Sequence, residues 1–339
     1  MQHNQLYTYF GCKKKMIDIV WTEYFHDIDM LIEPFAGTAV IACNKPDTVN
    51  VKTTYLNDYD CHIANVLRSV VYDSEALIDY ICHPRLELDL HMIHDYITGA
   101  KPYLRDLLMK NIDAHDVKLA GWWVWGINHW IGGSWCNCEL KKIDKLTEQY
   151  DEDFFVYPSG VGEKVSTGRN KLISSDQVTH QKISTDRNKL LHGDQLTHNK
   201  TSDRYDHVST IVNNIYDQLS EAKIMYGDFE RVITDSYTGD GKRVGIFMDP
   251  PYQKVSCATY DNLYGSSNLK EDHNTFDRAK KWFLDNYKNP KLKIILCGHK
   301  ECFDDIHCDI KKVEWKRGGG YAKDKDGQNS EMFITNIKS

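Results

Sequence analysis

The chain has 339 residues, of which 41% are hydrophobic and 27% charged, and its formal net charge is −7. This length predicts two domains, or one α/β domain that carries a large insertion. No apolar stretch is long enough to cross a membrane, and the N-terminus lacks a signal-peptide core, so we expect a cytoplasmic protein. The ten cysteines repeat no disulfide framework, which agrees with free thiols.

The excess of acidic residues argues mildly against a nucleic-acid partner, because phosphate binding normally requires a basic excess. The distribution of charge matters more than its sum. Residues 164–204 hold eight Lys or Arg against four Asp, a local charge of +4 that leaves −11 on the rest of the chain. This asymmetry permits a local contact with DNA on an acidic body.

A metal centre is not expected. Five ligand-type residues follow one another closely, but they show no paired Cys-x-x-Cys spacing, so we interpret them as buried or surface groups. They are Cys297, His299, Cys302, His307 and Cys308.

The folded part opens with the residues Tyr9-Phe10-Gly11-Cys12-Lys13, which lead into a helical pattern over residues 16–25. A glycine before a helix lets the backbone approach a ligand, and Lys13 could meet a carboxylate. A solvated lysine run is the alternative interpretation of this stretch.

Residues 30–32 predict a short buried strand, followed by Glu33-Pro34-Phe35-Ala36-Gly37-Thr38-Ala39 and a helix through Cys43. A single Gly37 cannot cradle a pyrophosphate, although the amides of a helix start would receive a carboxylate. Asp58 follows Gly37 by 21 residues, the distance at which a second-strand acid binds ribose hydroxyls in doubly wound folds. The pair suggests a nucleoside ligand without phosphates, and a plain βαβ unit with a polar loop remains the alternative.

Helical patterns continue over residues 63–71, 75–82 and 86–118. Residues 121–135 then hold five of the eight tryptophans. The residues on one helical face of this stretch are typical of a protein core; they are Leu119, Trp122, Trp123, Gly126 and Trp130. The alternative places the stretch beside a cleft, with a flipped nucleotide near Asn128, His129, Ser134 or Trp135.

An internal repeat follows a polar linker at residues 139–163. Residues 164–172 recur as residues 182–190, and the match continues to the end of the second copy, with a period of 18. Two copies are too few for a solenoid. The segment 164–199 either reads bases and phosphates with its Arg, Asn, Lys, Gln and His side chains, or is a flexible surface insertion.

The α/β pattern then returns, with a helix over residues 209–222 and a strand over residues 223–229 that contains Asp228. A helix over residues 272–287 and a buried strand over residues 292–298 follow the central motif described next. Residues 310–315 and 331–336 predict a hairpin-like pair joined by a glycine-rich loop.

The central motif is Ile246-Phe247-Met248-Asp249-Pro250-Pro251-Tyr252. Proline cannot donate to a sheet ladder, so the buried strand ends at Asp249 and leaves a stiff loop at its carboxyl end. The loop offers one carboxylate, proline carbonyls and one aromatic face, a set that suits a planar base with an exocyclic amine. A strand that ends in a Pro-Pro turn over a buried tyrosine is the alternative.

Together these motifs resemble a Dam-like N6-adenine DNA methyltransferase of the phage or prophage type. The resemblance implies an α/β fold: a Rossmann-like sheet of S-adenosylmethionine-dependent methyltransferases with a mostly helical target-recognition insertion. Residues 1–72 and 209–339 would form the catalytic and cofactor-binding domain. Residues 73–208 would be the DNA-recognition insertion. DNA is the expected partner, the protein is expected to be a monomer, and a partner restriction nuclease is left unknown.

The resemblance also assigns roles to residues. Catalysis would rest on Asp249, Pro250, Pro251 and Tyr252. S-adenosylmethionine would contact Tyr9, Lys13, Glu33, Phe35, Gly37, Asp58, Asp228 and Asp249, with Lys13 near its carboxylate and Asp58 on its ribose. The glycine loop departs from the family by ending Gly37-Thr38-Ala39 where a second glycine is common.

Three other functions compete with adenine methylation. N4-cytosine methyltransferases usually carry serine where this chain has Asp249, and protein-glutamine methyltransferases usually carry asparagine there. A non-catalytic DNA-binding relative is disfavoured by the intact Lys13, Asp58, Asp249 and Tyr252.

Overall fold

The computed structural model describes residues 3–7, 13–83, 85–130, 135–136, 198–238, 242–251, 274–316 and 330–337. The repeat at 164–199 lies almost wholly outside these ranges, with only the first residues of helix α8 inside them. Residues Tyr9, Ser134 and Tyr252, the linker 139–163 and the glycine-rich loop near the C-terminus also lie outside. Within the described ranges no helix is both long and apolar enough to span a membrane.

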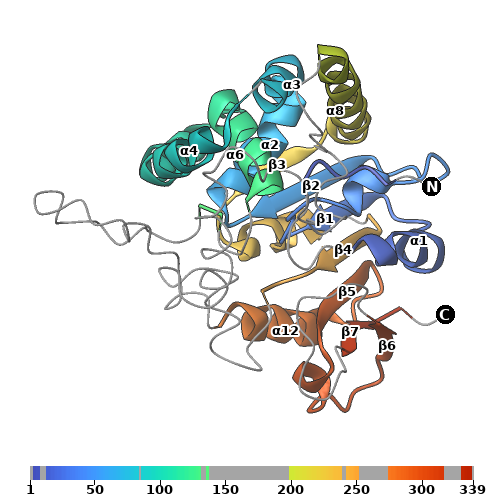
Figure 1. The fold of residues 1–339 in the computed structure, drawn as a ribbon. Coiled ribbons are helices and arrows are strands. Elements are labelled where there is room, and N and C mark those ends of the chain that lie inside the picture. Colours follow the sequence, from blue (N-terminus) through green and yellow to red (C-terminus); the bar gives the residue numbers. More distant parts are fainter. Residues whose placement is uncertain are drawn as a thin grey trace, which may run out of the picture.

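A seven-stranded sheet forms the centre of the molecule, with strand order β3-β2-β1-β4-β5-β7-β6 (Figure 1). Its first five members in space are parallel, and β7 runs antiparallel to both β5 and β6. The strands are β1 (Met30–Glu33), β2 (Thr53–Asp58), β3 (Lys223–Tyr226), β4 (Val244–Met248), β5 (Leu292–His299), β6 (Lys311–Lys316) and β7 (Ser330–Thr335). The predicted α/β class and the predicted terminal hairpin are confirmed.

Alternation along the buried strands gives the sheet two apolar faces. Leu31, Phe247 and Ile295 point into one core, and Ile32 and Ile246 point into the other. The second core is covered by α12 (Thr275–Asn286), the 3₁₀ turns η4 (Phe229–Val232) and η6 (Lys300–Phe303), and the short helix α9 (Asp235–Thr238).

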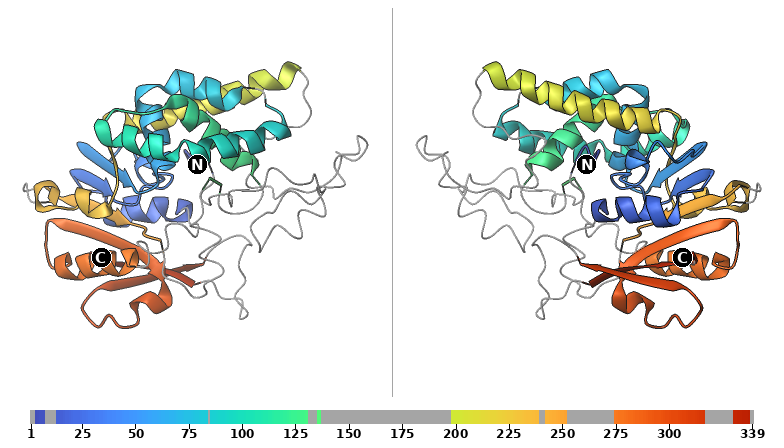
Figure 2. Two further views of the ribbon diagram at one scale, coloured as in Figure 1. Left: turned by 90° about the vertical axis from the view of Figure 1, so that its left-hand side faces the viewer. Right: turned by 90° about the vertical axis from the view of Figure 1, so that its right-hand side faces the viewer.

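The first face carries a thick helical layer, which Figure 2 shows from two sides. Its members in the order of the chain are the run η1–α1–η2 (Lys14–Met16, Ile17–Ile19, Val20–Tyr24), α2 (Cys61–Tyr72), α3 (Ser74–Cys82), α4 (Glu87–Gly99), α5 (Lys101–Lys110), α6 (Val117–His129) and α8 (His198–Leu219). The turn η2 is π-helical. Residues from all these helices join the sheet in one buried cluster.

The division into a catalytic domain and an insertion stays a prediction. Helix α8 runs without a break through the expected boundary at residues 208 and 209, and it begins at His198, eleven residues before the predicted start. The helical structure expected over residues 86–118 consists of α4, α5 and the first residues of α6, which are separated at Ala100 and by an interruption at residues 111–116.

Buried Arg68 explains that interruption. Its side chain is 2% exposed, and its guanidinium donates to the carbonyl oxygens of Leu108, Asn111 and Ala114 and to that of Ile224 at the start of β3. A buried arginine needs acceptors for its five donors, and the carbonyls released between α5 and α6 supply them. The guanidinium therefore connects α2 to β3, to α5 and to the segment between α5 and α6.

The tryptophan-rich stretch begins in helix α6, and the predicted core face is confirmed in part: Leu119, Trp123 and Gly126 are buried, whereas Trp122 and Trp130 are only partly buried. Trp123 and Trp125 are buried, and a side-chain carbon on Gly126 would lie 1.9 Å from the Trp135 ring. Trp135 itself donates to the Trp123 carbonyl over 3.1 Å. Whether any of this stretch approaches a nucleotide remains a prediction, although Trp135 and Asn128 are both committed to internal contacts.

Candidate functional site at the carboxyl edge of the sheet

The carboxyl ends of the parallel strands bring four acidic residues to one edge of the sheet. Glu33 ends β1, Asp58 ends β2, Asp228 follows β3 by two residues and Asp249 follows β4. Strand register fixes this arrangement, because Ile32 lies opposite Ile246 and Asp58 lies opposite Tyr226. Open α/β sheets bind ligands at this edge.

Asp249 lies directly after the fully buried strand β4 and is itself 20% exposed. The Lys13 ammonium stands 2.9 Å from its carboxylate oxygen Oδ2, and the Lys13 side chain is only 3% exposed. An ammonium that is buried without a counter-charge is costly. Burial of Lys13 therefore favours its contact with the Asp249 carboxylate. The expected Lys13 contact with a carboxylate is thus made inside the protein; its contact with a cofactor carboxylate stays a prediction.

Glu33 lies beside this pair in a fully buried position. Its Oε1 accepts a hydrogen bond of 2.7 Å from the Ala42 amide, yet burial, together with the nearby Asp249 charge, raises the pKa of the Glu33 carboxyl to about 8. At neutral pH this carboxyl therefore holds a proton when no ligand is bound. A cation placed against it would favour its ionised form.

The glycine loop between β1 and β2 is tightly folded. Gly37 has φ of 51°, and Ala39 also has a positive φ, 49°. The Gly37 amide donates to Asp58 Oδ2 over 2.8 Å, and the Gly37 carbonyl accepts from the Tyr7 hydroxyl over 2.8 Å. The loop is thereby fixed from β2 on one side and from the N-terminal segment on the other.

The prediction of a helix that continues through Cys43 is wrong. Only a 3₁₀ turn, η3 (Ala42–Asn44), follows the loop. The left-handed conformation of Ala39 breaks a regular helix at its start, and Pro46 prevents an extension beyond it.

Asp58 is half-buried and receives backbone donors from two directions. Its two oxygens accept from the amides of Gly37 and Asp60, at 2.8 and 2.9 Å. Burial and the neighbouring Asp60 charge nevertheless raise the pKa of Asp58 to about 7, against the lowering effect of those donors. An acid held this way at the end of the second strand can accept hydrogen bonds from ribose hydroxyls.

Asn57, which the sequence reasoning did not single out, joins two loops of the site. Its side chain is 1% exposed, and its amide nitrogen donates to the carbonyls of Pro34 and Gly227, over 3.0 and 2.9 Å. The only sequence signal was its position immediately before Asp58.

The third loop, after β3, presents Asp228 and Phe229. Burial opposes ionisation of Asp228, but hydrogen bonds from Arg278 and from the Glu230 amide outweigh it and lower the pKa of Asp228. The Arg278 fork binds both carboxylate oxygens at 2.9 Å. Arg278 comes from α12, fifty residues away, and nothing in the sequence pointed to this contact.

An aromatic wall stands next to these acids. The Phe35 and Phe229 rings lie 4.9 Å apart at an interplanar angle of 31°, and the Arg278 guanidinium stands 4.9 Å from the Phe229 ring centre. Phe35 was predicted to contact the cofactor, and the structure places it between the glycine loop and the β3 loop. The predicted residues Lys13, Glu33 and Asp249 lie together, as do Gly37 and Asp58.

One group of potential metal ligands exists among the described residues. Single ligand atoms of Asp60, Cys61 and His62 lie within 4.8 Å of one another. Asp60 is already used as the cap of α2, accepting from the His62 amide over 2.9 Å. No disulfide joins the seven described cysteines.

The chemistry of the edge can be stated from these contacts. Carboxylates dominate it and an aromatic pair flanks it. Of its cations, Lys13 and Arg278 pair with Asp249 and Asp228, and Arg231 donates to the Tyr226 carbonyl. Such a donor set fits a cationic nucleoside with ribose hydroxyls. S-adenosylmethionine, with its sulfonium charge and adenosine, has these features.

Comparison with protein families agrees with this chemistry. Residues 9–118 match the model of the D12 class N6 adenine-specific DNA methyltransferases. The matched part runs from the N-terminal motif through α6's first residues, and so includes Lys13, Glu33, Gly37 and Asp58 but not Asp249. No curated protein matches the chain.

Proposed function

We propose that the chain, an adenine-specific DNA methyltransferase by its match over residues 9–118, is of the Dam-like type and acts through Asp249, Pro250, Pro251 and Tyr252 on a flipped adenine. The observation that carries the proposal is the Lys13–Asp249 pair at the carboxyl edge of the sheet. It joins a residue inside the matched segment to the Asp-Pro-Pro-Tyr motif outside it, at 2.9 Å.

Methyltransferases of this class take the methyl group from S-adenosylmethionine, and here we assign its contacts to the acidic edge. Asp58 would accept hydrogen bonds from the ribose hydroxyls. Phe35 would line the adenine ring beside Asp228, and Gly37 would let the backbone approach the ligand. Tyr9 is assigned with them by the sequence motif. When bound, the cofactor supplies an electrophilic methyl group on a positively charged sulfur.

Asp249 and Pro250 would bind and orient the nucleophile, the N6 amine of the target adenine. A target adenine must leave the duplex to reach them, which costs roughly a few kcal/mol. The Asp249 carboxylate and the Pro250 carbonyl accept hydrogen bonds from the N6 amine, and Tyr252 stacks on the base. These bonds draw the nitrogen lone pair out of conjugation with the ring and aim it at the methyl carbon. A methylated N6 would carry a positive charge and would have to release one proton, which the Asp249 carboxylate could accept.

Lys13 keeps Asp249 ready for this task. Glu33 is buried close by, and this burial, with a smaller contribution from the Asp249 charge, raises the pKa of its carboxyl to about 8. The Lys13 ammonium lies 2.9 Å from Asp249 Oδ2 and holds this carboxylate in place directly after β4. Positioning and electrostatics then suffice, and no covalent enzyme intermediate is needed.

The direct test is mass spectrometry of nucleosides from DNA incubated with the protein and isotope-labelled S-adenosylmethionine. We expect label in N6-methyladenine, and expect its loss in Asp249→Ala with cofactor binding retained. Label in N4-methylcytosine would correct the base, and methyl transfer by a folded Asp249→Ala protein would remove Asp249 from the reaction. DNA binding without any labelled base would indicate a non-catalytic relative.

A further inference from the structure

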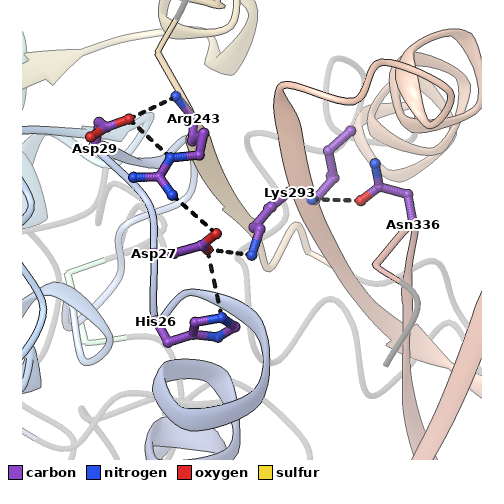
Figure 3. Close-up of polar contacts among 7 residues, drawn as sticks. His26, Asp27, Asp29, Arg243, Lys293 and Asn336 are labelled. Carbon is purple, nitrogen blue, oxygen red and sulfur yellow. Dashed lines mark hydrogen bonds and ion pairs between the residues drawn. The ribbon is translucent and has the colours of Figure 1, made fainter.

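Several cations of the described part of the chain form ion pairs with acidic side chains. At the amino edge of the sheet, Arg243 bonds to Asp27 and Asp29, and Lys293 also binds Asp27 (Figure 3). Arg278, Lys280 and Lys300 are paired in the same way elsewhere. With 49 acidic against 42 basic residues, an excess of carboxylates is available for such pairs.

We call three cations of the helical layer, Arg85, Lys118 and Arg204, the cation cluster. Within the described residues none of the three forms an ion pair. Arg85 and Lys118 both stand near the Trp122 ring, with the guanidinium carbon 5.8 Å and the ammonium 4.5 Å from its centre. Arg85 also lies 5.3 Å from the Trp125 ring.

The two arginines meet at one turn. Arg204 of α8 donates to the Ile81 carbonyl over 3.2 Å, and Arg85 donates to the His83 carbonyl over 3.2 Å. Two guanidiniums are thereby anchored at carbonyls two residues apart. The Arg204 Nε is buried and has no hydrogen-bond partner within the described structure.

This arrangement disfavours both positive charges. Burial and the neighbouring Arg204 charge lower the pKa of Arg85 to about 10, and burial lowers the pKa of Arg204 as well. Both groups keep their charge at neutral pH, so two like charges remain together at a cost. An anion at this point would remove that cost.

Helix α6 contributes Lys118 to the cluster and the tryptophans that Arg85 faces, and it also contacts the N-terminal segment of the candidate site. Trp123 of α6 packs edge-on against Tyr7 at 5.1 Å, and the Tyr7 hydroxyl binds the glycine loop. Trp122 and Trp125 of the same helix carry the cation cluster. Helix α6 therefore contacts the cation cluster through Trp122 and Trp125, and the glycine-loop side through Trp123 and Tyr7.

We propose that Arg85 and Arg204, assisted by Lys118, bind backbone phosphates of the DNA substrate. The guanidinium fork matches phosphate geometry, and Arg85 stands over the Trp122 and Trp125 rings without forming an ion pair with a described carboxylate. The proposal rests on the proposed DNA methyltransferase activity for the identity of its ligand. Phosphate contacts of this kind position the duplex and do not read its sequence.

The test is the salt dependence of binding to a duplex oligonucleotide, measured by fluorescence anisotropy without cofactor. Arg85→Gln and Arg204→Gln should each reduce the slope of log K against log salt concentration by about one, and the double variant by about two. Lys118→Gln should reduce it by up to one. Arg85→Lys and Arg204→Lys should retain most of the slope, because the charge remains.

The matched control is Lys281→Gln, which removes one exposed cation from α12, on the other face of the sheet. Its slope should equal that of the unaltered protein. An unchanged slope in the folded single variants would overturn the proposal, as would an equal fall in Lys281→Gln. If Arg85→Gln or Arg204→Gln fails to fold, the slope of Lys118→Gln tests the proposal instead. This variant leaves the hydrogen bonds of the two arginines to the His83 and Ile81 carbonyls in place.

Nucleoside mass spectrometry separates the two proposals. A reduced slope in a protein that methylates no base would support the phosphate site while refuting the activity. Normal methylation with an unchanged slope in all variants would support the methyltransferase activity and refute the phosphate site.

Discussion

Ala39 offers a test of the conformation of the glycine loop. It is fully buried and has a φ of 49°, a left-handed conformation that costs a residue with a side chain roughly 1–2 kcal/mol. Replacement by glycine removes this cost. It also removes a buried methyl group, which destabilises the folded protein by about 0.8 kcal/mol. The greater backbone freedom of glycine in the unfolded chain destabilises the fold by a further amount of about 0.5–1 kcal/mol. The opposing effects nearly cancel, so Ala39→Gly should change the free energy of unfolding by less than about 0.5 kcal/mol.

Ala64 is the matched control, because it is equally buried but lies within the regular helix α2. Ala64→Gly loses the same methyl group and about 1 kcal/mol of helix propensity, with no strain to relieve. We expect it to destabilise the protein by about 2 kcal/mol. Urea unfolding of both variants, compared at equal m-values, measures the difference.

The result that would refute this reasoning is a loss in Ala39→Gly as large as that in Ala64→Gly. It would mean that Ala39 has an ordinary negative φ in solution. The regular helix expected from the sequence could then follow the loop after all.

Two further predictions concern buried polar groups of the site. The pKa of Glu33 is raised to about 8 from 4.5, so the stability given by its neutral form is full below pH 4.5 and is lost as the pH rises through 8; Glu33→Gln should lack this fall, which amounts to a few kcal/mol at most. If the free energy of unfolding depends on pH in the same way in Glu33→Gln and in the unaltered protein, the raised pKa of Glu33 is wrong. Asn57→Ala, which frees two carbonyls, should weaken S-adenosylmethionine binding by roughly 10- to 100-fold in calorimetry. Asn65→Ala, which breaks a comparable buried bridge to Asp116, should lower stability and leave cofactor affinity unchanged.

Much of the framework is determined by local sequence. Buried strands such as residues 244–248 are read from their apolar runs, and the Pro-Pro pair ends the strand because it cannot donate to the ladder. Parallel strands bring their terminal acids to one edge, so Glu33, Asp58 and Asp249 could be grouped from the amino-acid sequence alone. Gly37 was recognisable because its loop lies between a strand and an acid on the next strand.

Only the tertiary structure decided which partners these groups meet. Lys13 could have bound any carboxylate, and burial selects Asp249. Arg278 reaches Asp228 across fifty residues, and Asn57 joins two loops that are 193 residues apart in sequence, between Pro34 and Gly227. The left-handed Ala39 shortened a helix that the sequence pattern predicted, and Arg68 interrupted another by drawing carbonyls away from it. These outcomes depend on long-range burial and hydrogen bonding, because a short stretch of sequence fixes its own periodicity but not the charge or donor that will face it after folding.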